Sequence, residues 1–269
     1  MIVLPDEWKK SWKIDKNGLK DLFNVQGELF REKDGRRTLR FQFKENYFFG
    51  KFHSGVGWKK IIKNLLQFRK PPVLSAQNEW QAIIKLNKIN INTMNLVGYG
   101  KQGLNPAKIK SFVITEELQD VISLEDYCRD WKNNPPDNAI KNAVIKKVAE
   151  IARTIHGNGM SHKDLYICHF LLDISCGINN IDPGNIRLFL IDLHRVDIRS
   201  KIGFKWRAKD ISAILFSSMD LGLTKHDFFY FVKHYHNTTA ENSLSKHWFF
   251  WWYVKKRAKK LYKKGIRPL

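Results

Sequence analysis

Acidic residues and cysteines are scarce in this sequence, and each shortage excludes a class of protein. The three cysteines, Cys128, Cys168 and Cys176, are odd in number and lack the paired spacing of metal ligands, which excludes a disulfide framework and a structural zinc site. A reducing compartment is therefore expected. Only 26 acidic residues oppose 47 basic ones, so the net charge is +21. Such a charge attracts polyanions: nucleic acid, an anionic membrane, an acidic protein or a phosphorylated glycan.

Long apolar runs are also missing. A transmembrane helix needs about 18 apolar residues in succession, and a signal peptide needs an apolar run of roughly 7 to 15 residues near its start. The sequence has neither, so we expect a protein that is not exported and does not span a membrane. Hydrophobic residues make up 43% of the chain and no long stretch is rich in Pro, Gly or Ser, which predicts an ordered globular protein.

Hydrophobic periodicity predicts a β-rich first half and a helical second half. Residues 22–53 are typical of three strands in an antiparallel meander. Apolar residues recurring from Ile140 to Ile155 indicate a long helix, which is followed by a polar loop at 161–166. The other predicted elements are helices at 58–68, 77–89, 207–222, 224–236 and 244–264, and short strands at 95–101, 111–115, 170–172 and 187–192.

The polar loop contains His162-Lys163-Asp164, with His169 five residues after the aspartate. Protein kinases place H-R-D-x-x-x-x-N between a long helix and a strand, where the aspartate accepts or orients the proton of the attacking hydroxyl and the asparagine helps to hold a metal ion. Asp164 is therefore the predicted catalytic base, and His169 stands at the metal-binding position. The H-x-D tripeptide alone is weak evidence for a catalytic site, because it often arises by chance.

Asp192 follows the apolar run RLFLI and is predicted to end that strand, on the same face as Leu188 and Leu190. A carboxylate there needs a compensating charge. Mg²⁺ bridging the phosphates of ATP would supply it, as in kinases. The alternative is a turn residue or a salt bridge to Arg195.

Lys51 and Glu79 form a second predicted pair. Lys51 alternates with Tyr47 and Phe49 along a strand, so its stem is expected to lie toward the interior. Glu79 lies on the apolar stripe of the helix at 77–89. The two would reproduce the lysine–glutamate ion pair that orients ATP phosphates in kinases, although each alone is more often a surface charge.

The remaining nucleotide contacts are predicted on weaker patterns. A G-x-G-x-x-G loop is absent, because the segment at 25–41 offers only Gly27 and Gly35, and Gly27 is the predicted phosphate-loop glycine. Glu116 and Leu118 end a strand where kinases place the adenine-binding hinge, and a plain strand-to-loop transition is the alternative. With the catalytic loop, these features predict an α+β, two-lobed protein-kinase-like fold. One domain is expected over 1–269, with an N-lobe at 20–117, a C-lobe at 118–241 and a basic aromatic helix at 242–269.

Longer segments resemble the lipopolysaccharide core heptose I kinase family. They are GMSHKDLYICHFLLD, IDLHR, KDISAILFSSMDLGLT, RRTLRF, IIKNLL, SLEDYCRDW and NPP, and the resemblance covers most of residues 20–236. It implies transfer of the γ-phosphate of ATP to a hydroxyl of the first heptose of the inner core. Asp164 matches the family's active-site aspartate, and Lys51, Glu79 and Asp192 take the ATP and metal roles. His169 departs from the kinase pattern, because imidazole is a poor ligand for Mg²⁺.

Two residues near the motif keep alternative interpretations. Asp210 is either an N-cap or first-turn acid of a helix, or a brace for the catalytic loop as in kinases. Cys168 is either a reactive thiol or a half-buried structural cysteine, and the structural interpretation is favoured because cysteine packs well as a small hydrophobe.

The end of the chain combines aromatic residues with positive charge. After Glu241 there are nine Lys or Arg and no acid, preceded by the run WFFWWY at 248–253. This combination is typical of a peripheral anchor at an anionic membrane. The alternative is a C-terminal helix that packs on the protein and has a solvated basic end, which would have the same sequence pattern. We expect a cytoplasmic protein, peripheral on the inner membrane, whose partners are the lipopolysaccharide acceptor and an acidic protein such as acyl carrier protein. Nucleic acid is not expected.

Two other functions remain open from the sequence. One is a different sugar kinase of the same fold, of the Kdo or aminoglycoside type. The other is a membrane- or nucleic-acid-binding protein whose kinase site is vestigial, which the absent glycine loop and His169 would permit.

Overall fold

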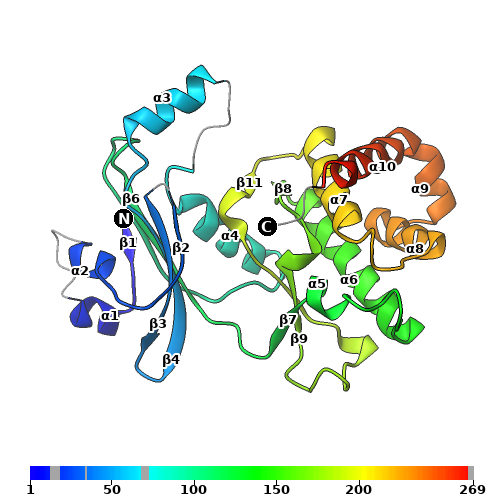
Figure 1. Ribbon diagram of the computed structural model, residues 1–269, viewed down its shortest axis with the longest axis horizontal. Coiled ribbons are helices and arrows are strands. Elements are labelled where there is room, and N and C mark those ends of the chain that lie inside the picture. The colour runs from blue at the N-terminus through cyan, green and yellow to red at the C-terminus, as the bar shows by residue number, and fades with distance from the viewer. Residues whose placement is uncertain (13–18, 34, 68–72, 266–269) are drawn as a thin grey trace. The chain divides into compact units, whose positions relative to one another are not determined.

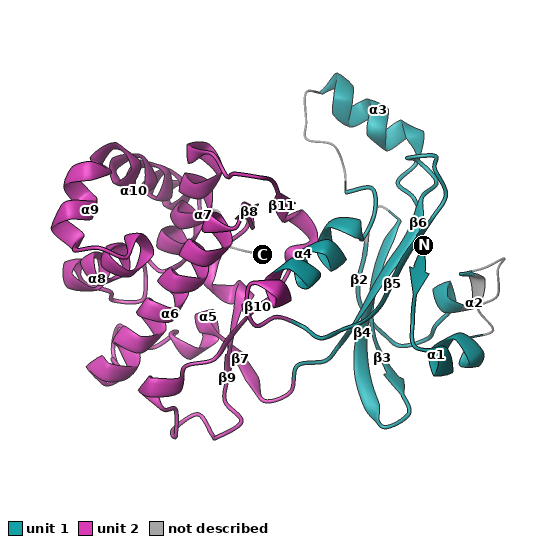
Figure 2. Ribbon diagram, turned by 180° about the vertical axis from the view of Figure 1, so that it is seen from behind, with its two compact units in different colours: residues 1–85, 94–118 teal, residues 86–93, 119–269 magenta. Residues whose placement is uncertain are grey.

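The computed structural model describes residues 1–12, 19–33, 35–67 and 73–265, which form two compact units. Unit 1 comprises residues 1–85 and 94–118, and unit 2 comprises residues 86–93 and 119–269 (Figure 2). Unit 1 contains an antiparallel sheet and unit 2 is mostly helical, which is the α+β class predicted from the sequence (Figure 1). None of the helices in the described parts of the chain is both long and apolar enough to cross a membrane.

Unit 1 is built on a sheet with the strand order β1-β5-β6-β4-β3-β2. Its strands are β1 (Ile2–Val3), β2 (Glu28–Lys33), β3 (Arg36–Phe43), β4 (Asn46–His53), β5 (Leu96–Gln102) and β6 (Lys110–Glu116). The predicted meander is confirmed, because β2, β3 and β4 pair in succession. β6 pairs with both β4 and β5 and so lies inside the sheet.

The two faces of the sheet have different covers. On one face, Phe41, Phe48 and Phe52 join a core with Trp8 of α1 (Asp6–Ser11) and Leu22 of α2 (Lys20–Phe23). α2 replaces the start of the first predicted strand, because Leu19 and Leu22 are one helical turn apart and both are buried. The other face carries α4 (Gln77–Lys88), whose Trp80 stacks on Tyr99 of β5 with ring centroids 5.2 Å apart.

A further helix of unit 1, α3 (Trp58–Leu66), leaves the sheet after β4. The sequence predicts its end at Phe68, which lies outside the described residues, as does Arg267 of the basic tail. None of the residues of α3 is buried.

Unit 2 is organised around α6 (Asn138–Gly157), which buries the predicted stripe of Val144, Val148, Ile151 and Ile155. Its other helices are α5 (Leu124–Tyr127), α7 (Phe204–Ser217), α8 (Lys225–His236), α9 (Ala240–Lys246) and α10 (Trp248–Lys263). α6 packs on α8, and α7 packs on α10. The single helix predicted over 244–264 is therefore two helices, which are separated at His247.

Short strands and 3₁₀ turns of unit 2 carry the polar loop. An antiparallel ladder joins β7 (Val121–Ser123), β9 (Phe170–Asp173) and β10 (Leu188–Leu190), and β8 (Met160–Ser161) pairs with β11 (Asp197–Ile198). The 3₁₀ turns are η1 (Ile167–His169), η2 (Pro183–Asn185) and η3 (Leu193–Arg195). The loop at 162–169 runs from β8 to β9.

Candidate active site

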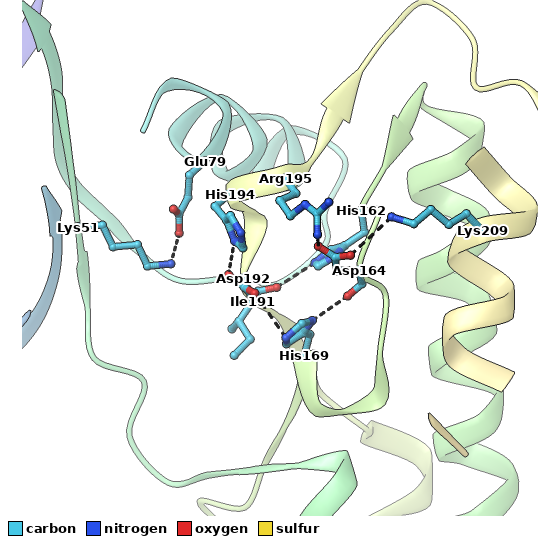
Figure 3. A network of polar contacts seen from close by, with 10 residues as sticks. All are labelled: Lys51, Glu79, His162, Asp164, His169, Ile191, Asp192, His194, Arg195 and Lys209. Atoms are coloured by element: carbon cyan, nitrogen blue, oxygen red, sulfur yellow. Dashed lines mark hydrogen bonds and ion pairs between the residues drawn. The ribbon is translucent and has the colours of Figure 1, made fainter. Parts of the chain in front are cut away.

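Asp164, the predicted catalytic base, is held between two cations within unit 2. Its side chain is 15% exposed, and its Oδ2 lies 2.7 Å from Nη1 of Arg195. Its Oδ1 lies 3.5 Å from Nζ of Lys209, which belongs to α7 (Figure 3). The two cations compensate the carboxylate charge and limit the orientations that the side chain can take. Such a carboxylate presents a negative charge at a defined place, where it can orient a hydroxyl.

Asp210 fixes the backbone of the same loop. The N–H groups of His162 and Lys163 donate to its two carboxylate oxygens, at 2.8 Å and 2.7 Å. Lys163 has φ +71, a left-handed conformation that costs energy outside glycine, and these bonds offset that cost. The interpretation of Asp210 as an N-cap is wrong, because α7 begins at Phe204 and Asp210 lies in its middle. The brace interpretation is confirmed.

Two side chains complete the environment of the Asp210 carboxylate, which is 0% exposed. The hydroxyl of Ser161 donates to Oδ2 at 2.8 Å, and Nε2 of His156 lies 3.2 Å from the same oxygen. Burial raises the pKa of Asp210, but the hydrogen bonds and charges around it lower the pKa by more, so the net direction is below the usual value. Asp210 is thus an anion that positions the loop, and its side chain is closed off from solvent.

The two histidines of the loop stack with ring centroids 5.7 Å apart. His162 donates from Nε2 to the carbonyl oxygen of Ile191 at 2.9 Å, and burial lowers its pKa, so it is neutral at pH 7. His169 donates from Nδ1 to the backbone carbonyl of Asp164 at 2.7 Å, which directs its Nε2 to Oδ2 of Asp192 at 3.5 Å. His169 therefore links the catalytic loop to the turn after β10.

The sequence predicts that Asp192 ends the strand, but in the structure Asp192 lies beyond the strand. β10 ends at Leu190, and Asp192 adopts φ +58 at the start of η3, so the strand alternation no longer applies to it. Its Oδ1 lies 2.6 Å from Nδ1 of His194. The alternative partner, Arg195, has its guanidinium on Asp164.

The residues around Asp192 fit Mg²⁺ in part. A carboxylate oxygen is the ligand that Mg²⁺ prefers, whereas the nitrogen of His169 is not. Within the described residues, no group of three or more His, Cys, Asp or Glu side chains is arranged to hold a metal. Asp192 is therefore suited to a site that phosphate oxygens and water complete, and His169 is better suited to positioning.

In unit 1, Lys51 and Glu79 form the pair that the sequence predicts. Nζ of Lys51 lies 2.6 Å from Oε1 of Glu79, whose side chain is only 2% exposed (Figure 3). Lys51 lies opposite Val113 on the sheet face that α4 covers. A carboxylate buried this deeply needs its cation, and the lysine stem in turn is held toward the helix. The role of this pair in ATP binding stays a prediction.

The weaker nucleotide predictions, Gly27, Glu116 and Leu118, also lie in unit 1. A Cβ at Gly27 would stand 2.3 Å from the carbonyl oxygen of Arg40, so glycine is required there by the close approach to β3. Glu116 ends β6 and accepts a hydrogen bond from Nδ2 of Asn95 at 2.9 Å. Leu118 is half-buried just beyond the strand. The nucleotide roles of all three stay predictions.

Sequence reasoning missed Arg195 and Lys209 as partners of Asp164. Both lie next to residues of predicted motifs, since Lys209 precedes Asp210 and Arg195 ends IDLHR. The available clue was that a catalytic carboxylate in a polar loop needs a cation. Cys168 is half-buried, and burial raises its pKa to about 12, which agrees with the structural interpretation.

A helix-to-strand loop carrying Asp164 and braced by a buried aspartate, together with a lysine–glutamate pair that joins an antiparallel sheet to a helix, defines a phosphotransferase with a protein-kinase-like fold. The comparisons give the family. Residues 20–235 match the family model described as lipopolysaccharide kinase (Kdo/WaaP), and the chain belongs to that family.

Named relatives match almost the whole chain. The chain is 40% identical over 267 residues to the lipopolysaccharide core heptose(I) kinase WaaP of Escherichia coli, covering 99% of each. It is 38% identical to the WaaP of Pseudomonas aeruginosa, covering 98% of this chain and 96% of that protein. A solved structure described as WaaP in complex with acyl carrier protein has a TM-score of 0.83 and 33% identity, covering 97% of this chain and 99% of that one. The predicted family and fold are confirmed.

Proposed function

We propose that the protein transfers the γ-phosphoryl group of ATP to a hydroxyl of the first heptose of the lipopolysaccharide inner core. The observation that carries this proposal is the placement of Asp164 between Arg195 and Lys209 on a loop held by Asp210. The names of the relatives, which are heptose(I) kinases, support the choice of acceptor. Both units would serve as lobes of one kinase domain, with boundaries near 20–117 and 118–241 and a C-terminal segment at 242–269.

In the proposed reaction, the acceptor hydroxyl oxygen bonds to the γ-phosphorus as the bond to the ADP oxygen breaks, and its proton passes to a carboxylate oxygen of Asp164. Arg195 and Lys209 hold that carboxylate in place. Lys51, oriented by Glu79, would bind ATP phosphates. Mg²⁺, when bound, would neutralise charge on the phosphates, and Asp192 is the residue suited to hold it.

The test compares wild type with Asp164→Asn on inner-core lipopolysaccharide that lacks its heptose phosphate. Mass spectrometry follows the gain of one phosphoryl group with Mg-ATP. We expect the variant to lose about a hundredfold or more in kcat, the scale for removal of a positioned base. Asp137→Asn, at an exposed position whose side chain makes no cap hydrogen bond, is the matched control and should retain full activity. Equal rates for Asp164→Asn and wild type would refute the assignment.

A Kdo hydroxyl is the second candidate acceptor, because the family description names Kdo as well as WaaP. Offering acceptors that present only Kdo, or Kdo plus the first heptose, separates the two. Phosphate found on Kdo would replace the heptose proposal and leave the role of Asp164 intact. A vestigial site would give no transfer to either acceptor.

An acyl carrier protein is the proposed protein partner, because the solved relative is described as a complex with one. Within unit 2, a cavity of 640 Å³ is lined by apolar side chains that include Trp131, Val148, Ile214, Phe228, Trp251 and Val254. Lys225, Lys255 and Lys259 also line it. Burial lowers the pKa of Lys255, and repulsion from Lys259 and Lys225 lowers it further. An acidic partner that presents an acyl chain would relieve this repulsion and fill the cavity.

The partner proposal is tested by co-purification with acyl carrier protein at low salt. Charge reversal in Lys255→Glu/Lys259→Glu should abolish capture, whereas Lys88→Glu/Lys201→Glu, at exposed positions away from the cavity lining, should weaken it only slightly. Equal capture by both double variants would show that overall charge, and not this cavity, attracts the partner.

We also propose that the protein is cytoplasmic and peripheral on the inner membrane, since its acceptor is a lipid-anchored glycan. The sequence predicts that the C-terminal aromatic and basic segment makes this contact. On α10, however, Phe250, Trp251 and Val254 are buried in unit 2, while Trp248 and Trp252 are exposed. Much of the apolar surface of this segment is thus occupied by packing.

A further inference from the structure

Helix α3 carries a set of large apolar side chains that the described residues of unit 1 leave exposed. Trp58 is 50% exposed, Ile62 48%, Leu65 73% and Leu66 73%. Their spacing of four, seven and eight residues from Trp58 places them on one side of the helix. We call these four residues the α3 apolar face. A face of this kind is costly to leave in water, so it points to a partner.

The opposite side of α3 is basic. Lys59, Lys60 and Lys63 are arranged around it, and residues 58–66 contain no acid. The helix therefore combines an apolar face with a cationic face, which is the pattern of helices that lie in the plane of a membrane interface. Nine residues give a length of about 13 Å, too short to span a bilayer.

A further exposed apolar residue lies in a loop that contacts the segment before α3. Leu104, in the turn between β5 and β6, is 98% exposed. The N–H of Gly57, just before α3, donates to the carbonyl oxygen of Ala107 in that turn at 3.0 Å. The contact is close, since a Cβ on Gly55 would stand 2.5 Å from the same oxygen. The turn and the helix thus form one edge of unit 1, and Figure 1 shows α3 standing away from the sheet.

We propose that the α3 apolar face and Leu104 bind an anionic lipid bilayer, with the apolar side chains in the headgroup and acyl boundary and the lysines on the headgroups. Charge favours a bilayer over a second copy of this chain. A second copy would bring the same three lysines against this face, and the chain as a whole carries +21, so self-association is opposed. A bilayer offers apolar depth and negative charge together. Its biological purpose rests on the proposed function, because a lipid-anchored acceptor would then be met at the surface that holds the enzyme.

The test is flotation of the full-length protein with vesicles of phosphatidylethanolamine containing roughly one-third phosphatidylglycerol. Wild type should bind these vesicles and bind pure phosphatidylcholine vesicles poorly. Leu65→Ser/Leu66→Ser should reduce binding about tenfold or more, given the apolar area withdrawn from the bilayer. Lys59→Gln/Lys63→Gln should reduce it on the order of tenfold, and high salt should remove that difference.

Ile178→Ser is the matched control, because Ile178 is 45% exposed in unit 2, and its binding should equal that of wild type. The α3 residues are not buried, so their variants should keep the wild-type Tm. The proposal would be overturned if Leu65→Ser/Leu66→Ser bound anionic vesicles as well as the wild-type protein does. It would also be overturned if the wild-type protein did not bind these vesicles.

A kinase assay separates this proposal from the proposed function. On an acceptor freed of its lipid anchor, Leu65→Ser/Leu66→Ser should be as active as wild type, whereas on acceptor embedded in vesicles it should be slower. Absence of transfer by wild type on the freed acceptor would count against the kinase proposal alone, because vesicle binding does not require catalysis.

Discussion

Asp210→Asn should loosen the catalytic loop and slow the reaction without touching the reacting groups. Oδ1 of Asp210 accepts one hydrogen bond, from Lys163, whereas Oδ2 accepts from Ser161, His162 and His156. The asparagine amide would therefore place its NH₂ at the Oδ1 position, where it loses one bond. In the opposite orientation, the NH₂ group would face the three donors of Ser161, His162 and His156.

The lost bond to a charged acceptor and the N–H of Lys163 left without an acceptor together cost about 3 kcal/mol. For a chain of 269 residues, whose unfolding entropy is about 2.1 cal/mol/K per residue, that lowers Tm by about 5 °C. Displacement of the loop by even about 1 Å would cost about a hundredfold in kcat. Because the Asp210 side chain is 0% exposed and so is closed to substrate, KM should change much less than kcat.

Calorimetry and initial rates, taken well below the Tm of the variant, measure both effects. Asp137→Asn is the control, since exposed substitutions usually change stability by less than about 0.5 kcal/mol. An unchanged Tm together with an unchanged kcat would show that Asp210 neither stabilises the fold nor positions the loop. A lowered Tm with the wild-type kcat would show that Asp210 stabilises the fold but does not position the loop.

Acid provides an independent check on Asp210. Its folded pKa lies below the ordinary value of 3.8, so its stabilisation is present above that value and is lost as the pH falls through the folded pKa. The difference in urea midpoint between wild type and Asp210→Asn should therefore be constant near neutral pH and shrink below pH 3.8. A difference that grows in acid would contradict the sign.

Three further predictions concern other ionisable groups. Lys51→Met should destabilise unit 1 by about 3 kcal/mol, because the 2% exposed Glu79 carboxylate loses its cation. Adding Glu79→Gln to this variant should restore most of the urea midpoint without restoring ATP binding. Burial and the neighbouring charges lower the pKa of His236 to about 4, so stability should fall as the pH drops from 6.5 toward 4, and a His236→Gln variant showing the same slope would contradict this. Iodoacetamide should alkylate exposed Cys176 well before Cys168, whose pKa is raised to about 12, as peptide mass spectrometry would show.

Local patterns in the sequence were sufficient for most of the fold and for part of the site. Strand alternation and helical periodicity predicted the meander and α6, because the side chains that must be buried recur at the spacing of the element itself. Asp164 could be predicted from its tripeptide and its position in the chain. The Lys51–Glu79 pair could be predicted because two charges on inward faces of one unit require each other, and the structure places their atoms 2.6 Å apart.

The tertiary structure decided the contacts between distant segments. Asp210 reaches the N–H of His162 across 48 residues, and Arg195 and Lys209 reach Asp164 from η3 and α7. Asp192 lies in a left-handed turn and not in the strand that the sequence predicts. No local periodicity encodes such contacts, since they depend on how α7 packs against the loop. Spacing in the sequence determines which side chains share a face of an element, and only the packing of elements determines what that face meets.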